Sequence, residues 1–104
     1  MSNKETNSPT IVDLLKLYSS SQKPNETLEA FLLRLSRIAA DLNLGKLADC
    51  MIATQFAIGI RNKKISHSLM NIEISSAEQA LARALRQQKK LKRKKTKVEF
   101  HVTL

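Results

Sequence analysis

The sequence is poor in the residues that form turns, sheets and disulfides. Gly and Pro each occur only twice in 104 residues, Trp is absent, and aromatic residues make up 4%. Strands favour aromatic and β-branched residues and all-β folds need many turns, so this scarcity argues against a β fold. Cys50 is the only cysteine, which excludes an intrachain disulfide and fits a reducing compartment.

Membrane and secretion signals are also missing. The sequence has no run of 18 apolar residues, so we expect no membrane span. Residues 1–8 are polar and contain no hydrophobic signal region, so we expect them to be disordered rather than a secretory signal. These absences predict a cytoplasmic location, and the basic run described below leaves a nuclear one open.

Groups suited to catalysis or metal binding are few. His67 and His101 are the only histidines, and neither has Cys or carboxylate neighbours at metal-ligand spacing. Cys50 lies in an apolar segment, where we expect a buried thiol rather than a nucleophile. No Gly-rich phosphate loop is present. We therefore expect no enzymatic activity, no metal, no cofactor and no small-molecule substrate.

The formal charge of +9 is concentrated at the C-terminal end. Residues 1–85 carry ten Lys or Arg against eight Asp or Glu, whereas residues 86–104 carry eight against Glu99 alone. Such a tail predicts an RNA or DNA partner, bound without base-specific readout because no aromatic residue is interleaved. A solubilising tail and a nuclear localisation signal are the alternatives. The predicted nucleic-acid-binding residues are Arg86, Lys89, Lys90, Lys92, Arg93, Lys94, Lys95 and Lys97.

Apolar residues spaced three or four apart recur along most of the chain, which is the period of an α-helix. We expect an all-α fold, a small orthogonal four- to five-helix bundle with a basic C-terminal tail. The boundaries we expect are 1–8 for the disordered segment, 9–86 for the helical domain and 87–104 for the tail. The expected helices cover 9–18, about 27–42, 47–58, 63–70 and a last segment from 77 into the tail.

Several helix ends and faces can be predicted from local signals. Ser8, followed by Pro9, is the predicted N-cap of the first helix. Asn62 is the predicted N-cap of the helix at 63–70, and Ser75 and Glu78 are predicted to form a capping box at the start of the last helix. The alternating segment 98–104 has no partner strand and is expected to be an irregular tail. The expected inward residues of the first helix are Ile11, Leu14, Leu15 and Tyr18, and those of the fourth are Ile65, Leu69 and Met70. The expected inward stripe of the second helix is Leu28, Phe31, Leu32, Leu35, Ile38, Ala39 and Leu42.

Four residues around the start of the second helix form a motif, Gln22-x3-Glu26-x4-Phe31-x2-Arg34. A turn packed against a helix leaves backbone groups that need hydrogen-bond partners. Gln22 can both donate and accept. Glu26 can accept amides near the positive end of the helix dipole, and Arg34 can reach back to the carboxylate. We predict a structural network of these residues, against the alternative of unrelated surface groups.

This motif resembles the major homology region of Gag capsid proteins from retroviruses and gypsy-type LTR retrotransposons. The stretch from Phe56 to Asn62 is similar to a hydrophobic–x–Gly–Leu–Arg segment of the retrotransposon proteins and their domesticated relatives. The resemblance covers roughly residues 10–86. Lys23 stands where retroviruses usually have Gly, and a zinc knuckle is absent. The resemblance implies a capsid C-terminal lobe whose function is homotypic assembly.

Segment 47–58 is apolar on nearly every side. Leu47, Cys50, Met51 and Ile58 share one side, opposite another apolar set that includes Phe56. Such a helix is either central in a monomer or half-covered by a partner chain. The resemblance implies that the corresponding helix makes a two-fold contact, so we expect a homodimer or higher oligomer. The expected interface residues are Leu47, Met51, Ile52, Gln55 and Phe56.

We therefore expect a capsid-type oligomerisation module that recruits RNA through its tail. A nucleic-acid-binding adaptor or a hetero-interaction domain without self-assembly is the alternative.

Overall fold

The computed structural model describes residues 9–73 and 76–103, with side chains up to residue 93. Within those ranges the chain forms helices and turns without a strand, so the predicted all-α fold is confirmed. The elements in chain order are α2 (Ile11–Tyr18), α3 (Leu28–Ala40), the 3-10 turn η1 (Gly45–Leu47), α4 (Ala48–Gly59), α5 (Lys63–Met70) and α6 (Ala77–Thr103).

Helix α2 differs from the sequence prediction in its cap and in its buried face. Its N-cap is Thr10, whose hydroxyl accepts from the Asp13 amide while the Asp13 carboxylate accepts from the Thr10 amide. Leu17 is fully buried, whereas the predicted inward residues Ile11, Leu15 and Tyr18 are exposed. The following segment is hydrogen-bonded to α4, so tertiary contacts set the rotation of this two-turn helix.

Helix α3 follows the sequence prediction closely. The Thr27 hydroxyl caps it by accepting from the Ala30 amide. The helix ends before two residues of positive φ, Asn43 at 54° and Gly45 at 62°. Gly has no side chain and Asn a short polar one, so both residues tolerate this left-handed backbone conformation. Its buried side is the predicted one and contains Leu28, Phe31, Leu35 and Ala39.

Helix α5 begins as predicted, because the Asn62 side-chain oxygen accepts from the Lys64 and Ile65 amides. Ile65 and Leu69 are buried, but Met70, expected to face inward, is half exposed. The buried third position is Ser66, whose hydroxyl donates to the Ala57 carbonyl oxygen at 2.6 Å. A small polar residue lies here because it allows α5 to pack closely on α4.

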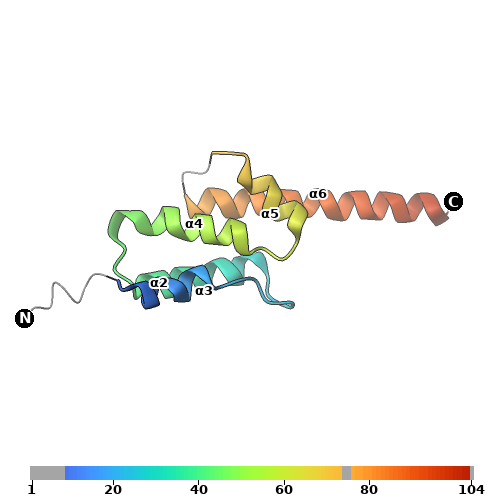
Figure 1. The fold of residues 1–104 in the computed structure, drawn as a ribbon. Helices are drawn as coiled ribbons and strands as arrows, with labels where there is room; N and C mark the ends of the chain where they lie inside the picture. Colours follow the sequence, from blue (N-terminus) through green and yellow to red (C-terminus); the bar gives the residue numbers. More distant parts are fainter. Residues whose placement is uncertain (1–8, 74–75, 104) are drawn as a thin grey trace, which may run out of the picture.

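Helix α6 is capped by Ser76, one residue later than predicted, through a bond from the Gln79 amide to the Ser76 hydroxyl. The predicted partner Ser75 lies outside the described residues. Ala77, Ala80 and Ala84 are buried, which allows close packing against α4 and α5. The helix continues to Thr103. The prediction of an irregular tail over 98–104 is therefore wrong for residues 98–103. Figure 1 shows α6 extending well past the other helices.

The core lies between α3, α4, α5 and α6, with α2 packed on its edge against α3 and α4. Figure 1 shows α3 and α4 side by side, with α5 and the first half of α6 beyond α4. The aromatic centre is Phe31 against Phe56, both without exposed area, with ring centroids 5.7 Å apart. Helix α4 is therefore the central element, which contacts every other helix of the described chain.

Gly59 at the end of α4 is required by close packing. A Cβ there would lie 2.7 Å from Phe31 Cζ and 3.0 Å from the Ser20 carbonyl oxygen. We expect Gly59→Ala to lower the free energy of unfolding by about 1–3 kcal/mol through overpacking. Gly45 provides the control, because nothing lies within 4 Å of its Cβ position and Asn tolerates its positive φ. Urea denaturation should show Gly45→Asn close to the parent, and equal losses in both variants would contradict this account.

Candidate functional site

The turn between α2 and α3 is tied to the end of α4 through Gln22. The Gln22 side-chain amide donates to the Glu26 carbonyl oxygen at 2.7 Å, and its side-chain oxygen accepts from the Arg61 amide at 3.0 Å. The Gln22 backbone amide donates to the Gly59 carbonyl oxygen at 2.9 Å. One residue therefore satisfies backbone groups on both sides of the contact, as a glutamine with donor and acceptor can.

Glu26 and Arg34 form a two-pronged ion pair beside this turn. Arg34 Nε donates to one carboxylate oxygen of Glu26 at 2.8 Å, and Nη2 donates to the other at 2.7 Å. The same Nη2 donates to the Ser21 carbonyl oxygen at 2.7 Å. Glu26 Oε1 also accepts from the Lys23 amide, which closes the turn. Only the planar fork of Arg can make all these bonds at once.

Phe31 and Arg34 connect this network to the core. The Arg34 guanidinium carbon lies 5.4 Å from the centroid of the Phe31 ring, within cation–π range. Phe31 in turn packs on Phe56 of α4. The structure thus brings together all four motif residues, and each has a structural role: it satisfies turn atoms or fills the core.

Sequence reasoning missed several partners of this network. Gln55, assigned from the sequence to an oligomer interface, is 5% exposed, and its side-chain amide donates to the Ser20 carbonyl oxygen at 2.7 Å. Ser20, Ser21 and Gly59 contribute through backbone atoms. Backbone partners leave no residue-type signal, although a lone Gln on an otherwise apolar turn of a helix does suggest a buried hydrogen bond.

The expected oligomer interface requires a correction. Ile52, Gln55 and Phe56 lie in the core, where α3 and α6 cover them, so they are not surface residues. Leu47 remains exposed and Met51 is half-buried. Helix α4 therefore has two apolar sides: one is buried in the core of the domain, and the other is exposed.

The uncovered side of α4 is a stripe of five residues at helical spacing, which we term the α4 stripe: Leu47, Cys50, Met51, Thr54 and Ile58. Leu47 is 64% and Ile58 52% exposed. Cys50 is exposed, which corrects the expectation of a buried thiol. The Thr54 hydroxyl donates to the Cys50 carbonyl oxygen, so it adds little polarity to the stripe.

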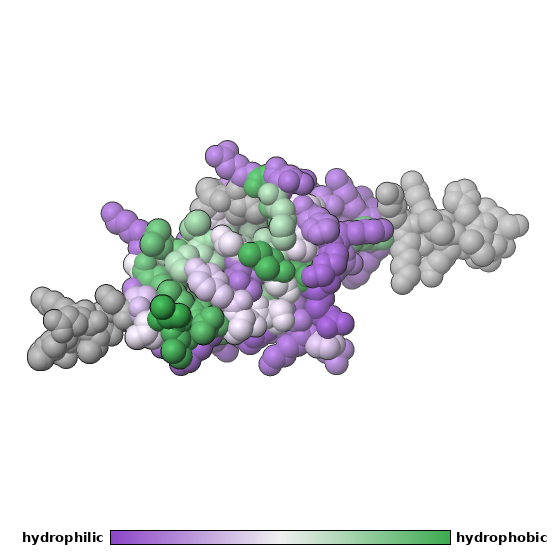
Figure 2. Space-filling model, viewed as in Figure 1, coloured by the Kyte–Doolittle hydropathy of each residue, from purple (hydrophilic) through white to green (hydrophobic). Residues whose placement is uncertain are grey.

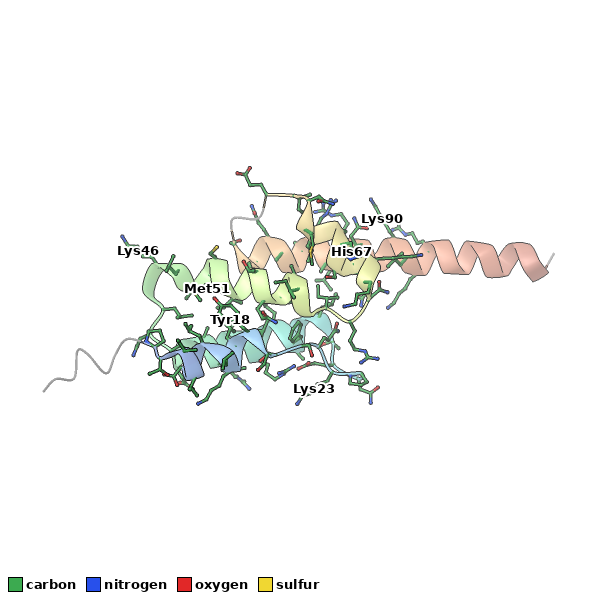
Figure 3. The ribbon with its side chains drawn as sticks, viewed as in Figure 1. Tyr18, Lys23, Lys46, Met51, His67 and Lys90 are labelled. Atoms are coloured by element: carbon green, nitrogen blue, oxygen red, sulfur yellow. The ribbon has the colours of Figure 1, made fainter. Side chains whose placement is uncertain are left out.

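The α4 stripe is flanked by further exposed apolar residues. On one side lies α2, which packs on α4 and exposes Ile11, Val12 and Leu15. On the other side a groove of about 330 Å³ separates the stripe from Met70 and Ile72. Figure 2 shows green over α2, around the start of α4 and at separate points nearer α5, all on one face. Figure 3 places Tyr18 of α2 close to Met51 of α4 on the same face.

The predicted nucleic-acid-binding cations all lie on α6, from Arg86 onward. Those with described side chains are all exposed: Arg86, Lys89, Lys90, Lys92 and Arg93. They occur on successive turns along one side of the helix, opposite Leu91, which packs on the core. The side chains of Lys94, Lys95 and Lys97 lie outside the described residues.

Two other kinds of site are absent from the described ranges. No group of three or more His, Cys, Asp or Glu side chains there is placed to hold a metal ion. No helix there combines the length and the apolar character needed to cross a bilayer.

Removing the Arg34 guanidinium should destabilise the fold, because it leaves the partly buried Glu26 carboxylate without its main partner. We expect Arg34→Ala to lower the free energy of unfolding by about 1.5–3 kcal/mol, the usual range for a charged hydrogen bond. Arg37→Ala is the matched control, because Arg37 is on the same helix and exposed; it should change stability by less than about 0.5 kcal/mol. Urea denaturation of both variants measures the difference, and similar losses would show that the ion pair has no special role.

The ion pair also predicts a dependence of stability on pH. The Arg34 hydrogen bonds, with a smaller contribution from the Lys23 amide, lower the pKa of Glu26 from 4.5 to about 2. Between these values the unfolded chain binds more protons than the folded one, so the free energy of unfolding should fall as pH drops from about 4.5 to 2. Hydrogen bonds from Thr10 lower the pKa of Asp13 and act in the same direction.

Denaturation of the parent and of Glu26→Gln at about pH 6, 4 and 3 isolates the Glu26 contribution. The variant should be less stable at the highest pH, and its stability should decline less steeply below about pH 4.5. Parallel pH profiles would show that Glu26 does not titrate as the ion pair requires.

Comparisons of the chain with protein-family models, with curated proteins and with solved structures gave no match.

Proposed function

We propose that this protein is a homotypic assembly module of the Gag capsid type, which self-associates through the α4 stripe and recruits nucleic acid through α6. The observation that carries the proposal is the α4 stripe itself, an uncovered apolar row on the central helix. Soluble monomers rarely expose large contiguous apolar patches, and such patches often mark interaction sites. The motif network around Glu26 and the order of the helices support the capsid-type assignment.

The charge distribution favours a second copy of this chain as the occupant of the stripe. Residues 1–85 carry ten Lys or Arg against eight Asp or Glu, so the helical bodies of two copies are nearly neutral and repel each other little. Asp49 is the only charged residue between Leu47 and Ile58, and its carboxylate accepts from the Ala77 amide. A two-fold contact brings each residue near its own symmetry mate, so an uncharged stripe is self-complementary where a charged one is not.

The rigidity of α4 supports the same function. The helix is held at its end by the bond from Gln22 to Gly59 and on its side by that from Gln55 to Ser20. Its buried face packs against α3 and α6. A surface presented on such a fixed helix loses little conformational entropy on association. The motif network thus serves assembly indirectly, by holding the helix that carries the contact.

The projecting cationic half of α6 supports nucleic-acid recruitment. Its exposed side chains can neutralise phosphates and release counterions, which provides affinity without base recognition. The same feature favours the alternative function, a nucleic-acid-binding adaptor in which the helical body only presents α6. The two functions differ in one measurable property, since only the first requires copies of the chain to contact each other.

Cys50 allows a direct test, because it is the only cysteine, is exposed and lies within the α4 stripe. We expect a short bis-maleimide reagent to join two chains through Cys50, and sedimentation to show a dimer at high micromolar concentration. Leu47→Asp and Ile58→Asp should each weaken the dimer about tenfold or more, the loss of about 1.4 kcal/mol typical of a central contact. Crosslinking should fall in parallel.

Leu33→Asp is the matched control, because it changes an equally exposed leucine on α3, away from the stripe. It should leave the dimer unchanged. A monomer at all concentrations, with and without RNA, would overturn the assembly proposal. RNA binding by that monomer would leave the adaptor, and dimers that respond to Leu33→Asp but not to Leu47→Asp would place the contact elsewhere.

A further inference from the structure

A second charged feature lies on the body of the molecule, at a cleft of about 400 Å³. Three segments distant in sequence form its walls: the turn before α3, the α4–α5 turn and α6. The buried side chains of Leu28, Ile60 and Ile65 lie at its floor. Its polar lining includes Arg61 and Asn62 from the α4–α5 turn, with Gln88 and Lys92 from α6.

The charge around this cleft is almost entirely positive. Lys63 and Lys64 follow directly on Arg61 and Asn62 at the start of α5, and all of them are exposed. The one carboxylate in the cleft is Glu26, which is already bound by Arg34 and has a pKa of about 2. It therefore provides no uncompensated negative charge, and the cleft favours an anion.

Backbone amides contribute little to this preference. The Arg61 amide donates to Gln22, and the Lys64 and Ile65 amides donate to the Asn62 side chain. An anion in the cleft would thus bind to side-chain cations rather than to the end of α5. The cations that line the cleft lie on separate elements, Arg61 on the α4–α5 turn and Lys92 on α6, so only the folded chain brings them together. Lys63 and Lys64 follow the lining residue Asn62 directly in the chain and are exposed.

We propose that this cleft binds the phosphate backbone of the same nucleic acid strand that α6 recruits, so that the strand passes from α6 onto the folded body. The inference rests on the nucleic-acid recruitment proposed above and adds Arg61, Lys63 and Lys64 to the interface. Lys92 lines the cleft and belongs to the cationic part of α6, which makes the two surfaces continuous.

The shape of the cleft favours a single strand over a duplex. A duplex presents its phosphates on a stiff convex surface and resists bending, whereas a single strand can follow a concave one. The described lining contains no aromatic side chain for base stacking. We therefore expect the strand to be bound without sequence preference and with a strong dependence on salt.

The test measures binding of the full chain to a fluorescent single-stranded RNA of mixed sequence at several salt concentrations. The variant Arg61→Gln/Lys64→Gln should bind about five- to tenfold more weakly at moderate salt. Its log–log salt slope should be shallower by about 1.4, at about 0.7 for each of two lost phosphate contacts on a single strand. Both residues are exposed, so circular dichroism should show an unchanged melting curve.

Lys16→Gln/Lys46→Gln is the matched control, because it removes the same charge from exposed sites on α2 and η1. Figure 3 shows Lys46 at the end of the molecule opposite Lys90. The control should keep the parent slope. Equal salt slopes in both double variants would contradict phosphate binding in the cleft but not the recruitment of nucleic acid by α6. No binding by the parent chain would instead refute the recruitment on which the cleft depends.

Discussion

The guanidinium group of Arg34 holds three oxygen atoms at once, both carboxylate oxygens of Glu26 and the carbonyl oxygen of Ser21. These bonds close the turn before α3 and place Gln22 against Gly59 at the end of α4. The turn in turn positions Phe31 on Phe56, the centre of the core. The arrangement of α2, α3 and α4 therefore depends on one ion pair that is partly shielded from water.

The position of α4 decides which residues are available for contacts. Held at its end and buried on one side, this helix exposes the α4 stripe and hides Ile52, Gln55 and Phe56. The same packing brings Arg61 of the α4–α5 turn near Lys92 of α6. The proposed assembly surface and the proposed phosphate-binding cleft thus both follow from how α4 is packed, and the cleft also includes Glu26 of the ion pair.

Helices with a strong apolar period could be predicted from the sequence, because burial of one face requires that period. Helix α3 matches the prediction for Leu28, Phe31, Leu35 and Ala39, which are buried, whereas the predicted inward residues Leu32 and Ile38 are only partly buried. Helix α2 does not: Leu17, which the prediction left out, is buried, Leu14 is partly buried, and Ile11, Leu15 and Tyr18 are exposed. The rotation of this two-turn helix is set by tertiary bonds of the segment that follows it.

The amino-acid sequence by itself determined the all-α class, the start of α3 near Thr27, the N-cap at Asn62, most of the inward face of α3 and the excess of cations on α6. These properties depend on neighbours within a few residues along the chain or on composition alone. Only the tertiary structure decided which side of α4 is exposed and why Gly59 has no side chain, and only there do Arg61 and Lys92 share a cleft. The physical reason is that burial and charge proximity arise between elements far apart in sequence, and an all-round apolar helix carries no local record of which side its neighbours will cover.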